Sequence, residues 1–342
     1  MHYLVTGHTG FKGAWLSIWL QSQGHTVSGI SLDPITGCLY ETAGVHELVT
    51  NDLRIDIRDY SAIKQAIASI KPDVLIHMAA QPLVRESYKD PRGTIETNAI
   101  GTLNILESVS ATPSVKAHLV VTTDKVYRNV NQVAGYVEND PLGGDDPYSA
   151  SKAMADIVTH SWITSFPGAP TAIARAGNVI GGGDVSPDRL LPDLINSFAA
   201  GRSPILRFPQ AVRPWQHVLD CLNGYLMICD HLLSGETTHE AFNIGPDEDS
   251  FVSVGEVANI VSEFWGGEFK WVQDQNENPH EAGLLALDAG RAIEILNWRN
   301  KLKFRDAIEW TVQWQARLEN GEKAIEVCHK QIDFFHQLQA PI

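Results

Sequence analysis

Short apolar runs alternate with longer amphipathic segments over the first half of the chain. The runs have the length and the Val/Ile-rich composition of buried strands, and the segments between them carry apolar residues at helical spacing. This alternation predicts a doubly wound parallel sheet with helices on both faces. We expect strands at 2–6, 25–33, 53–59, 74–77, 115–127 and 170–180, and helices at 14–24, 60–70, 91–110 and 146–166.

The pattern changes beyond Gly181, where strands and helices no longer alternate regularly. Helices are expected there at 252–265, 287–297 and 304–338, with the last one broken near Gly321. The fold class is therefore α/β, with a doubly wound parallel sheet and a smaller mixed α/β C-terminal lobe that binds the substrate. We expect a large domain at 1–180 with a return excursion at about 213–244, and a lobe at 181–212 and 245–342.

The first strand leads directly into GHTGFKG, a turn with three regularly spaced glycines. Strand, glycine turn and helix together are the context of a dinucleotide-binding fingerprint. Gly7 permits the tight turn, Gly10 lets backbone amides approach a pyrophosphate, and Gly13 lets the helix pack closely on the strand. The N-terminus of the helix then offers its N–H groups to the phosphates. This context favours a dinucleotide site over a plain strand–helix turn.

Asp33 ends the second strand, twenty residues after Gly13. A carboxylate at this place accepts hydrogen bonds from the hydroxyls of an adenosine ribose and repels a 2′-phosphate. No Arg or Lys follows Asp33 closely in the sequence. The pattern favours NAD over NADP, although a solvated turn aspartate before Pro34 is the alternative interpretation.

Composition narrows the class of protein. The 342 residues carry a formal net charge of −15, which disfavours nucleic acids and anionic membranes as partners. The four cysteines lack metal-binding spacing, and we expect reduced, packed thiols in a cytoplasmic protein. No apolar run approaches the length of about 18 residues that predicts a membrane span. A strand begins at once, which leaves no room for a signal peptide.

Tyr148 and Lys152 lie four residues apart in PYSASK, so on a helix they share one face. An ammonium beside a phenol favours the phenolate and lowers its pKa from about 10, which suits Tyr148 to act as a base near neutral pH. The same spacing also occurs by chance on exposed helices. The glycine turn upstream is what favours the catalytic interpretation.

The glycine turn, TTDK (122–125) and YSASK (148–152) together resemble the extended short-chain dehydrogenase/reductase family, whose members have a Rossmann sheet. Within that family the chain is similar to the nucleotide-sugar 4,6-dehydratases, and most to those that act on CDP-glucose. Lys125 marks this subgroup, because related dehydratases carry an acidic residue at its position. The chain departs from the pattern at Val185, where a Trp is expected. Further supporting stretches are HMAAQPLVR (77–85), RAGNVIGGGD (175–184) and VRPWQHVLD (212–220).

The resemblance implies a redox-neutral removal of water from a nucleotide-hexose, with NAD as the hydride carrier. Tyr148 then takes the proton of the sugar C4 hydroxyl, while Lys152 lowers the pKa of Tyr148 and Thr123 donates to the C4 oxygen. Asp124 protonates the departing C6 hydroxyl, which requires a raised pKa, and Lys125 removes the C5 proton. Alternatively, Lys125 only pairs with Asp124, and water or Asp124 takes the C5 proton.

The resemblance also assigns binding residues. Those implied for the cofactor are Gly7, Thr9, Gly10, Phe11, Gly13, Asp33, Asp56, Ile57, Ala79, Ala80, Asn98, Tyr148 and Lys152. Those implied for the substrate are Gln81, Asn178, Arg189, Arg213, Asn243 and His280. Arg213 has the best physical case, because a guanidinium matches phosphate oxygens in a bidentate fork. The family further implies a homodimer through the helices at about 91–110 and 146–166.

Three other functions stay open on the sequence alone. A nucleotide-sugar 4-epimerase needs Tyr148 and Lys152 but no acid–base pair, so Asp124 and Lys125 argue against it. A catalytically silent NAD-binding regulator needs neither the Tyr148/Lys152 pair nor the residues at the end of the fifth strand, so the presence of both argues against it. A 4,6-dehydratase that takes dTDP-, UDP- or GDP-hexose differs from one that takes CDP-glucose only in how the lobe recognises the base.

Overall fold

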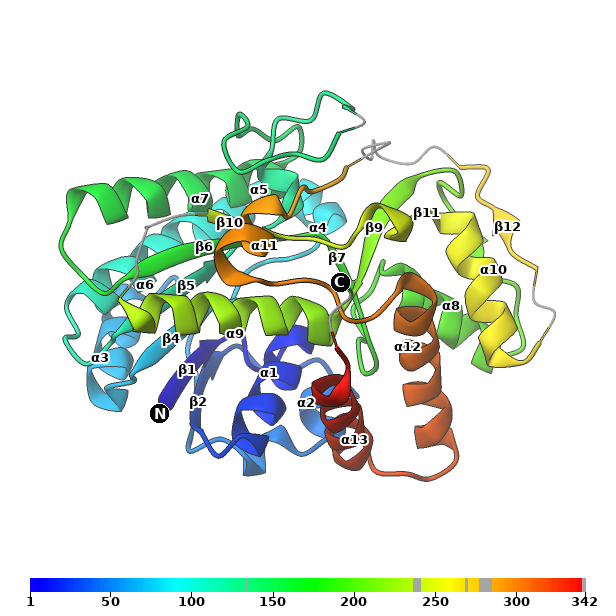
Figure 1. Ribbon diagram of the computed structural model, residues 1–342, viewed down its shortest axis with the longest axis horizontal. Coiled ribbons are helices and arrows are strands. Elements are labelled where there is room, and N and C mark those ends of the chain that lie inside the picture. Colours follow the sequence, from blue (N-terminus) through cyan, green and yellow to red (C-terminus); the bar gives the residue numbers. More distant parts are fainter. Residues whose placement is uncertain (133, 236–240, 268–269, 277–284, 340–342) are drawn as a thin grey trace.

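A seven-stranded parallel sheet forms the centre of the large domain in the computed structural model (Figure 1). The structure describes residues 1–132, 134–235, 241–267, 270–276 and 285–339. In spatial order the strands are β10 (Ala241–Ile244), β6 (Thr171–Ala176), β5 (Ala117–Val121), β4 (Val74–His77), β1 (His2–Thr6), β2 (Thr26–Ser31) and β3 (Asn51–Arg54). The order reverses at β1, which confirms the predicted doubly wound sheet.

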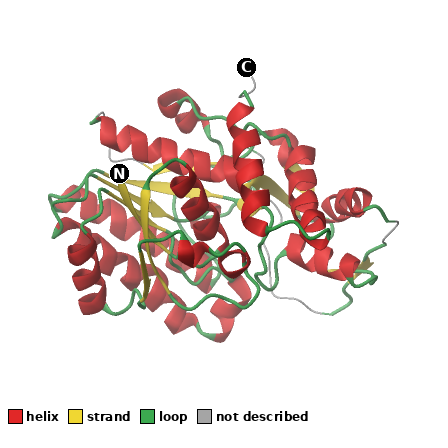
Figure 2. Ribbon diagram, turned by 90° about the horizontal axis from the view of Figure 1, so that it is seen from below, coloured by secondary structure: helices red, strands yellow, loops and turns green. Residues whose placement is uncertain are grey.

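Helices cover both faces of this sheet (Figure 2). One face carries α3 (Tyr60–Ile70), α6 (Gly101–Ser110) and α7 (Pro147–Ser165), and the other carries α1 (Phe11–Ser22) and α9 (Val218–Ser234). The helix predicted at 91–110 consists of α5 (Pro91–Ile95), the π-helix η2 (Glu96–Ile100) and α6.

Successive residues of a strand point into the two hydrophobic cores on opposite faces of the sheet. The strands are therefore continuous apolar runs in the sequence. Tyr3 and Val5 pack with Trp15 of α1 in one cluster. Leu4 packs with Ile63 of α3 in the cluster on the opposite face. A single strand therefore stabilises both helical layers.

A smaller lobe follows β6 along the chain. Its three-stranded sheet has the order β11 (Phe251–Ser253), β9 (Val212–His217), β7 (Asn178–Ile180), with β9 antiparallel to β11 and parallel to β7. The short strands β8 (Ile205–Leu206) and β12 (Val272–Gln273) pair in parallel. The core of the lobe also includes α8 (Leu190–Ala199), α10 (Val254–Trp265) and α12 (Phe304–Glu319).

The structure groups the elements differently from the expected domain division at three places. The strand predicted at 170–180 is split at Gly177, so that β6 joins the large sheet and β7 the small one. The predicted excursion began at 213, but β9 belongs to the lobe, and only α9 and β10 return to the large domain. Two helices predicted in the lobe, α11 (Gly290–Leu296) and α13 (Ala324–Gln337), pack on α9 and α1 of the large domain. Their apolar faces complete the core around Trp19 and Trp298, which sequence order alone does not reveal.

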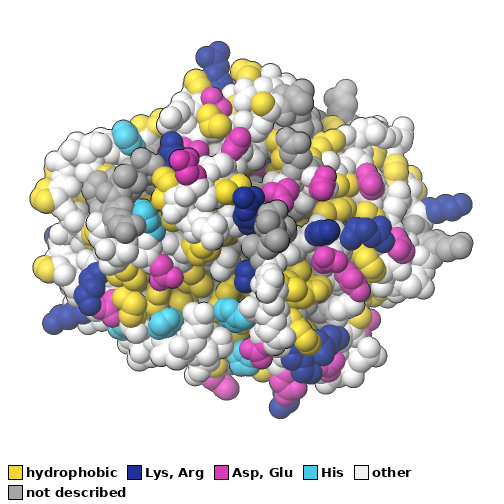
Figure 3. Space-filling view, in the orientation of Figure 1, with side chains coloured by type: hydrophobic (Ala, Val, Ile, Leu, Met, Phe, Trp, Pro, Cys, Tyr) yellow, Lys and Arg dark blue, Asp and Glu magenta, His cyan; other side chains and the backbone are white. Residues whose placement is uncertain are grey.

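The remaining short elements lie in the connections. They are α2 (Leu39–Thr42), η1 (Val45–Glu47), α4 (Val84–Lys89), η3 (Asp124–Val126) and η4 (Glu248–Ser250). Across the ranges given above, no helix has the length and apolarity needed to cross a bilayer. All four cysteines are free and buried. Acidic and basic side chains are interspersed on the face drawn in Figure 3.

Asp220 joins the two parts of the molecule. It lies on α9 of the large domain, and its carboxylate accepts hydrogen bonds from the backbone N–H groups of Lys301 (2.7 Å) and Leu302 (3.2 Å), just before α12 of the lobe begins. The side chain is 1% exposed. Burial raises the pKa of Asp220 to about 7.

This raised pKa predicts a pH-dependent stability. Below about pH 4 the carboxyl is protonated in both the folded and the unfolded chain, and between about pH 4 and 7 only the folded chain holds the proton. The stabilisation is therefore lost as the pH rises through 7. Relative to Asp220→Asn, which does not titrate, the wild type should lose on the order of 2–4 kcal/mol of unfolding free energy between about pH 4.5 and 8.

Urea unfolding of both proteins at several pH values measures this difference. Asp333→Asn is the matched control, because Asp333 is exposed on α13 and should give a constant difference. A constant difference for Asp220→Asn as well would contradict the assignment.

Candidate active site

The carboxyl ends of β1, β4 and β5 lie side by side in the parallel sheet and carry most of the residues singled out in the sequence. Ligands of open α/β sheets bind at this edge. Because β6 leads straight into β7 of the lobe, the same edge is also where the two parts of the chain meet.

The glycine turn has the geometry predicted for it. Gly7 has φ +79°, and its N–H donates to Ile30 O at 2.8 Å. A Cβ on Gly13 would lie 2.1 Å from Gly7 O, so α1 packs on the turn at a distance that only glycine permits. Ala79 N would lie 2.9 Å from a Cβ on Gly7, so Ala79 borders the turn. Ala80 follows it in the chain and is half-buried.

This turn fits the diphosphate of NAD. Gly10 is the N-cap of α1 and is exposed, no side chain caps the helix, and its first turn has no acidic residue. The first N–H groups of α1, beginning at Phe11, are therefore available to an anion at a helix end that favours negative charge.

At the ribose end, the structure adds a cation that the sequence did not place. Asp33 has a side chain that is 91% exposed, and Arg54 of β3 brings its Nε to 3.5 Å from Asp33 Oδ1. Thr9 has its hydroxyl committed to Ser31 Oγ (2.7 Å) and Leu32 O (3.1 Å). Thr9 therefore fixes the glycine turn to the end of β2 instead of presenting its side chain to a ligand.

Two residues predicted to bind the cofactor, Asp56 and Ile57, have their side chains engaged elsewhere. Asp56 forms an ion pair with Arg58 (2.6 Å), which lowers the pKa of Asp56. Ile57 is 4% exposed and packs against Gly101, so its side chain belongs to the core. Only the backbone of Ile57 can face the cofactor.

Three predicted catalytic residues are in direct contact. The Thr123 hydroxyl hydrogen-bonds the Tyr148 phenol and also donates to Asp124 Oδ1 at 2.8 Å. Thr123 and Asp124 follow β5, and Tyr148 lies in the first turn of α7, where Asp146 caps the helix by accepting from Ser149 N. All three side chains are less than 9% exposed.

Asp124 also meets Lys125. Lys125 Nζ lies 3.6 Å from Asp124 Oδ1, and Lys125 has 26% of its side chain exposed against 1% for Asp124. Asp124 Oδ2 is buried and accepts no hydrogen bond from any residue the structure describes. The geometry thus accommodates both interpretations of Lys125, as C5 base and as partner of Asp124.

The electrostatics of Tyr148 and Lys152 differ from the expectation. Burial raises the pKa of Tyr148 to about 12, against the opposing effects of Arg189 and Thr123. Burial and the charge of Lys12 lower the pKa of Lys152 to about 7. The expected lowering of the Tyr148 pKa by Lys152 is therefore wrong, because desolvation dominates.

Two predicted ligand-binding asparagines are structural. Asn98 on η2 is 1% exposed. Its side-chain amide accepts a hydrogen bond from Gln81 N and donates to Gln81 O and to Ser151 Oγ (2.8 Å). Asn243 on β10 is fully buried, and its amide bonds Tyr127 OH, Tyr136 O and Asp288 O. Neither side chain can contact a ligand without breaking these bonds.

The other predicted substrate residues differ in accessibility. Gln81 is half-buried, and its amide bonds Leu83 and Thr94. Asn178 on β7 is half-buried. Arg213 on β9 is 7% exposed and donates to Val212 O at 2.9 Å.

Arg189 is half-buried before α8, and its charge acts on Tyr148 and Lys12, so it faces the acid–base centre. His280 lies outside the described residues.

Two residues of the glycine turn escaped the sequence analysis. Lys12 donates to Tyr225 OH at 3.0 Å, and His8 is fully buried against Asp52 at 2.7 Å. The sequence offered only the polar character of these two side chains as a signal, and the motif was interpreted from its glycines.

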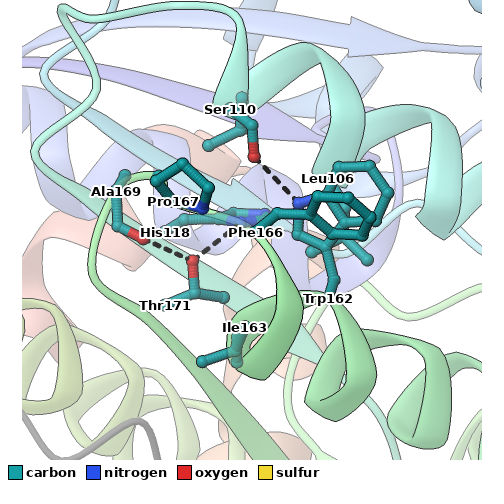
Figure 4. A pocket seen from close by; sticks show the side chains of 11 residues that line it. Leu106, Ser110, His118, Trp162, Ile163, Phe166, Pro167, Ala169 and Thr171 are labelled. Atoms are coloured by element: carbon teal, nitrogen blue, oxygen red, sulfur yellow. Dashed lines mark hydrogen bonds between the residues drawn. The ribbon is translucent and has the colours of Figure 1, made fainter.

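A cavity of about 310 Å³ lies at the amino ends of β5 and β6, on the side of the sheet away from the carboxyl ends that carry the catalytic residues (Figure 4). His118 of β5 and Trp162 of α7 line it, and Thr171 begins β6 there. None of the predicted catalytic or binding residues borders this cavity, so we do not assign it to the reaction.

Comparison with known proteins gives a consistent picture. Residues 3–245 match the model of the NAD dependent epimerase/dehydratase family. The chain is 40% identical to the CDP-glucose 4,6-dehydratase of Salmonella typhimurium over 95% of its own length and 93% of that protein. It is 25% identical to the dTDP-glucose 4,6-dehydratase of Haemophilus influenzae, over 92% and 97% of the two chains.

Solved structures with the same fold extend the comparison. The dTDP-glucose 4,6-dehydratase of Bacillus anthracis in complex with NAD superposes with a TM-score of 0.78 at 25% identity, covering 95% of this chain and 99% of that one. A UDP-glucose 4-epimerase of Thermotoga maritima has a TM-score of 0.79 at 21% identity, covering 93% and 100%, and shows the fold alone.

The position of Asp33 predicts a change in cofactor affinity. Asp33→Ala should weaken NAD binding about tenfold, because two ribose hydroxyls lose their acceptor, and should narrow the preference for NAD over NADP because Arg54 remains. Calorimetric titration with both dinucleotides measures this. Glu47→Gln removes a carboxylate that is also largely exposed, at 79%, and should change neither affinity. An unaltered affinity for NAD in Asp33→Ala would refute the ribose contact.

Proposed function

The chain belongs to the NAD dependent epimerase/dehydratase family, and we propose that its substrate is CDP-glucose, which it converts to CDP-4-keto-6-deoxyglucose and water. It is an NAD-dependent nucleotide-sugar 4,6-dehydratase, a hydro-lyase. The observation that carries the choice of substrate is the 40% identity to a CDP-glucose 4,6-dehydratase over 95% of this chain, against 25% to 29% for relatives named as dTDP-glucose 4,6-dehydratases.

The cofactor site is built from the edge of the large sheet. The glycine turn and the N-terminus of α1 hold the diphosphate, Asp33 the adenosine ribose, and Lys152 the second ribose. Bound NAD would supply a hydride acceptor for C4 and, once reduced, a hydride donor for C6 after the elimination, so that the reaction is redox-neutral overall. Everything else in the reaction is proton transfer by the side chains of this chain.

Tyr148 receives the proton of the C4 hydroxyl. Its phenol is buried, is oriented by the Thr123 hydroxyl, and lies on the same helix face as Lys152. Thr123 can donate to the C4 oxygen when its single hydroxyl proton turns from Asp124 Oδ1 to the substrate. The resulting C4 ketone acidifies the neighbouring C5 proton.

Asp124 and Lys125 then carry out the elimination. Asp124 protonates the C6 oxygen as it leaves, and its unpartnered Oδ2 is the atom available for this. Lys125 takes the C5 proton, since its amine is partly open to the site and adjoins Asp124 at 3.6 Å. In the alternative, Lys125 stays paired with Asp124, and water takes the C5 proton.

The lobe binds the nucleotide diphosphate. Arg189, whose charge acts on Tyr148, suits the phosphate nearest to the sugar, while Asn178 and Arg213 of the small sheet are candidates farther out. A guanidinium is the side chain best matched to phosphate oxygens.

One assay tests the substrate. The purified protein is incubated with CDP-, dTDP-, UDP- and GDP-glucose, and the products are weighed by mass spectrometry. We expect the loss of one water from CDP-glucose and no more than slow conversion of the others. Tyr148→Phe should still bind NAD but should form no product.

Other outcomes of this assay exclude the proposal. Loss of water from another nucleotide-glucose only would replace CDP-glucose as the substrate. An isomer of unchanged mass would indicate a 4-epimerase.

The role of Lys125 generates a separate prediction. Lys125→Ala should reduce deuterium incorporation at C5 in heavy water at least about tenfold, with a smaller effect on C4 oxidation, because only the second step loses its base. C4 oxidation is followed by the transient absorbance of the reduced cofactor. Lys116→Ala, at the opposite end of β5, is the control. Equal loss in both steps would assign Lys125 a structural role.

We also propose a homodimer through α7 and the continuous helical segment formed by α5, η2 and α6. Ile100 on η2 and Met154 and Ile157 on α7 are 47%, 43% and 54% exposed, although η2 and α7 pack together. A second copy of this face would bury all three, in a four-helix arrangement.

Ile157→Glu should therefore yield monomers, measured by size-exclusion chromatography with light scattering. A buried carboxylate without a partner makes association unfavourable. Ile295→Glu on α11, which is 40% exposed away from this face, should leave the oligomeric state unchanged. A dimer that persists in Ile157→Glu would place the interface elsewhere.

A further inference from the structure

Asp188 has an unusual backbone conformation at the point where the chain enters α8 of the lobe. Its φ is +60°, in the left-handed region that a residue with a Cβ rarely adopts. Arg189, the N-cap of α8, follows it directly. Such a conformation persists only where the surroundings hold it, so the contacts of Asp188 indicate what it serves.

The Asp188 carboxylate binds two guanidinium groups from different parts of the molecule. Its Oδ1 accepts from Arg85 Nη1 at 2.9 Å and from Arg207 Nη1 at 3.0 Å. Arg207 follows β8 and belongs to the lobe, whereas Arg85 lies on α4, in the connection after β4 of the large domain. The Arg85 bond therefore joins the large domain to the lobe, and the Arg207 bond stays within the lobe.

The helix that carries Arg85 also contacts the catalytic tyrosine. Ser87 of α4 is fully buried, and its Oγ accepts from the backbone N–H of Tyr148 at 3.1 Å. Residues two apart on a helix point in different directions, so α4 can bind both neighbours at once. One short helix thus links the start of α7 to the segment that carries Arg189.

The loop between β7 and α8 is fixed differently at its two ends. At the first end, Gly182 O accepts from Trp15 Nε1 at 2.9 Å, and a Cβ on Gly182 would lie 2.0 Å from Trp314 Cγ. At the second end, Arg85 and Asp188 have side chains that are 43% and 40% exposed. An ion pair between side chains this exposed contributes little stability, so it can break while the packed end stays in place.

We propose that the ion pair of Arg85 with Asp188, here called the latch, holds the lobe in the arrangement in which Arg189 can bind the substrate diphosphate. Arg85 and Asp188 are then positioning residues. Without the latch, only a fraction of the molecules has Arg189 in place, and the apparent affinity for the nucleotide-sugar falls with that fraction. The inference rests on the proposed function for the phosphate at Arg189. The effect of the latch on the loop is a property of the protein alone.

The first measurement needs no substrate. Amide hydrogen exchange of the NAD-loaded protein is followed by mass spectrometry in a peptide that spans residues 181–190. Exchange should be about two- to fivefold faster in Arg85→Met, because an exposed ion pair shifts an opening equilibrium by about that factor. Lys89→Met is the matched control, since it removes an ion pair of 2.9 Å with Glu86 that lies within α4, and it should leave this exchange unchanged.

The second measurement compares KM and kcat for CDP-glucose at saturating NAD. Arg85→Met should raise KM about two- to fivefold and leave kcat within a factor of about two, because the substrate-bound enzyme already has the loop in place. Arg85→Lys keeps a cation and should lie between Arg85→Met and the wild type.

A double-mutant cycle tests whether the two residues act through one contact. Asp188→Asn should raise KM at least as much as Arg85→Met, since Asn also tolerates a φ of +60° but carries no charge. The double variant should match Asp188→Asn, because the contact is already lost in the single variant. Thermal unfolding of each variant monitors the fold.

The outcomes separate the latch from other roles of these residues. An unchanged exchange rate in folded Arg85→Met overturns the proposal, and so do additive effects in the double variant. A lower kcat with unchanged KM also overturns it, and indicates instead that α4 acts on Tyr148 through Ser87. A wild type that fails to act on CDP-glucose refutes the substrate assignment, while the exchange measurement still decides the latch.

Discussion

The close approach of α1 to the turn after β1 is the constraint on which the site depends. With Gly7 O only 2.1 Å from where a Gly13 Cβ would be, any larger residue forces the helix away from the sheet. This packing directs the free N–H groups of α1 at the carboxyl edge of the sheet, where an anion can bind. Trp15 continues the contact by donating to Gly182 O at 2.9 Å, which ties the same helix to the loop that opens the lobe.

Buried polar networks fix the catalytic helix against this edge. Arg175 of β6 binds Asp156 of α7 through two hydrogen bonds and Tyr127 through a third, and Tyr127 reaches Asn243 of β10. Such groups are costly to bury unless every partner is present, so a satisfied network specifies one arrangement of β6, α7 and β10. The amide of Asn98 does the same for the loop after β4. The scaffold holds Tyr148 and Lys152 within a rigid frame, as proton transfer requires.

Burial also sets the chemistry of the pair. Removing a phenol from water disfavours its anion, and removing an ammonium from water disfavours its cation, so the two pKa values move in opposite directions from their ordinary ones. The phenol alone is a poorer base inside the protein than outside it. Lys152 is the group of the two whose pKa lies near 7, because burial and the charge of Lys12 both lower it. A site of this kind is controlled by its net charge as much as by its two named residues.

The sequence by itself determined the strands of the doubly wound sheet, the glycine turn and the catalytic helix, because each is encoded by local periodicity or by a motif within a few residues. Tyr148, Thr123 and Asp124 could be named from the motifs that contain them. Tertiary structure alone decided which polar side chains hydrogen-bond within the protein and are therefore not available to a ligand, since the partners of Asn98 and Asn243 come from distant segments. It also decided that α13 covers α1, and that Arg54 and Lys12 bring charge to the site. The electrostatic environment of a residue depends on its neighbours in space and on its burial, and neither can be derived from the order of the residues alone.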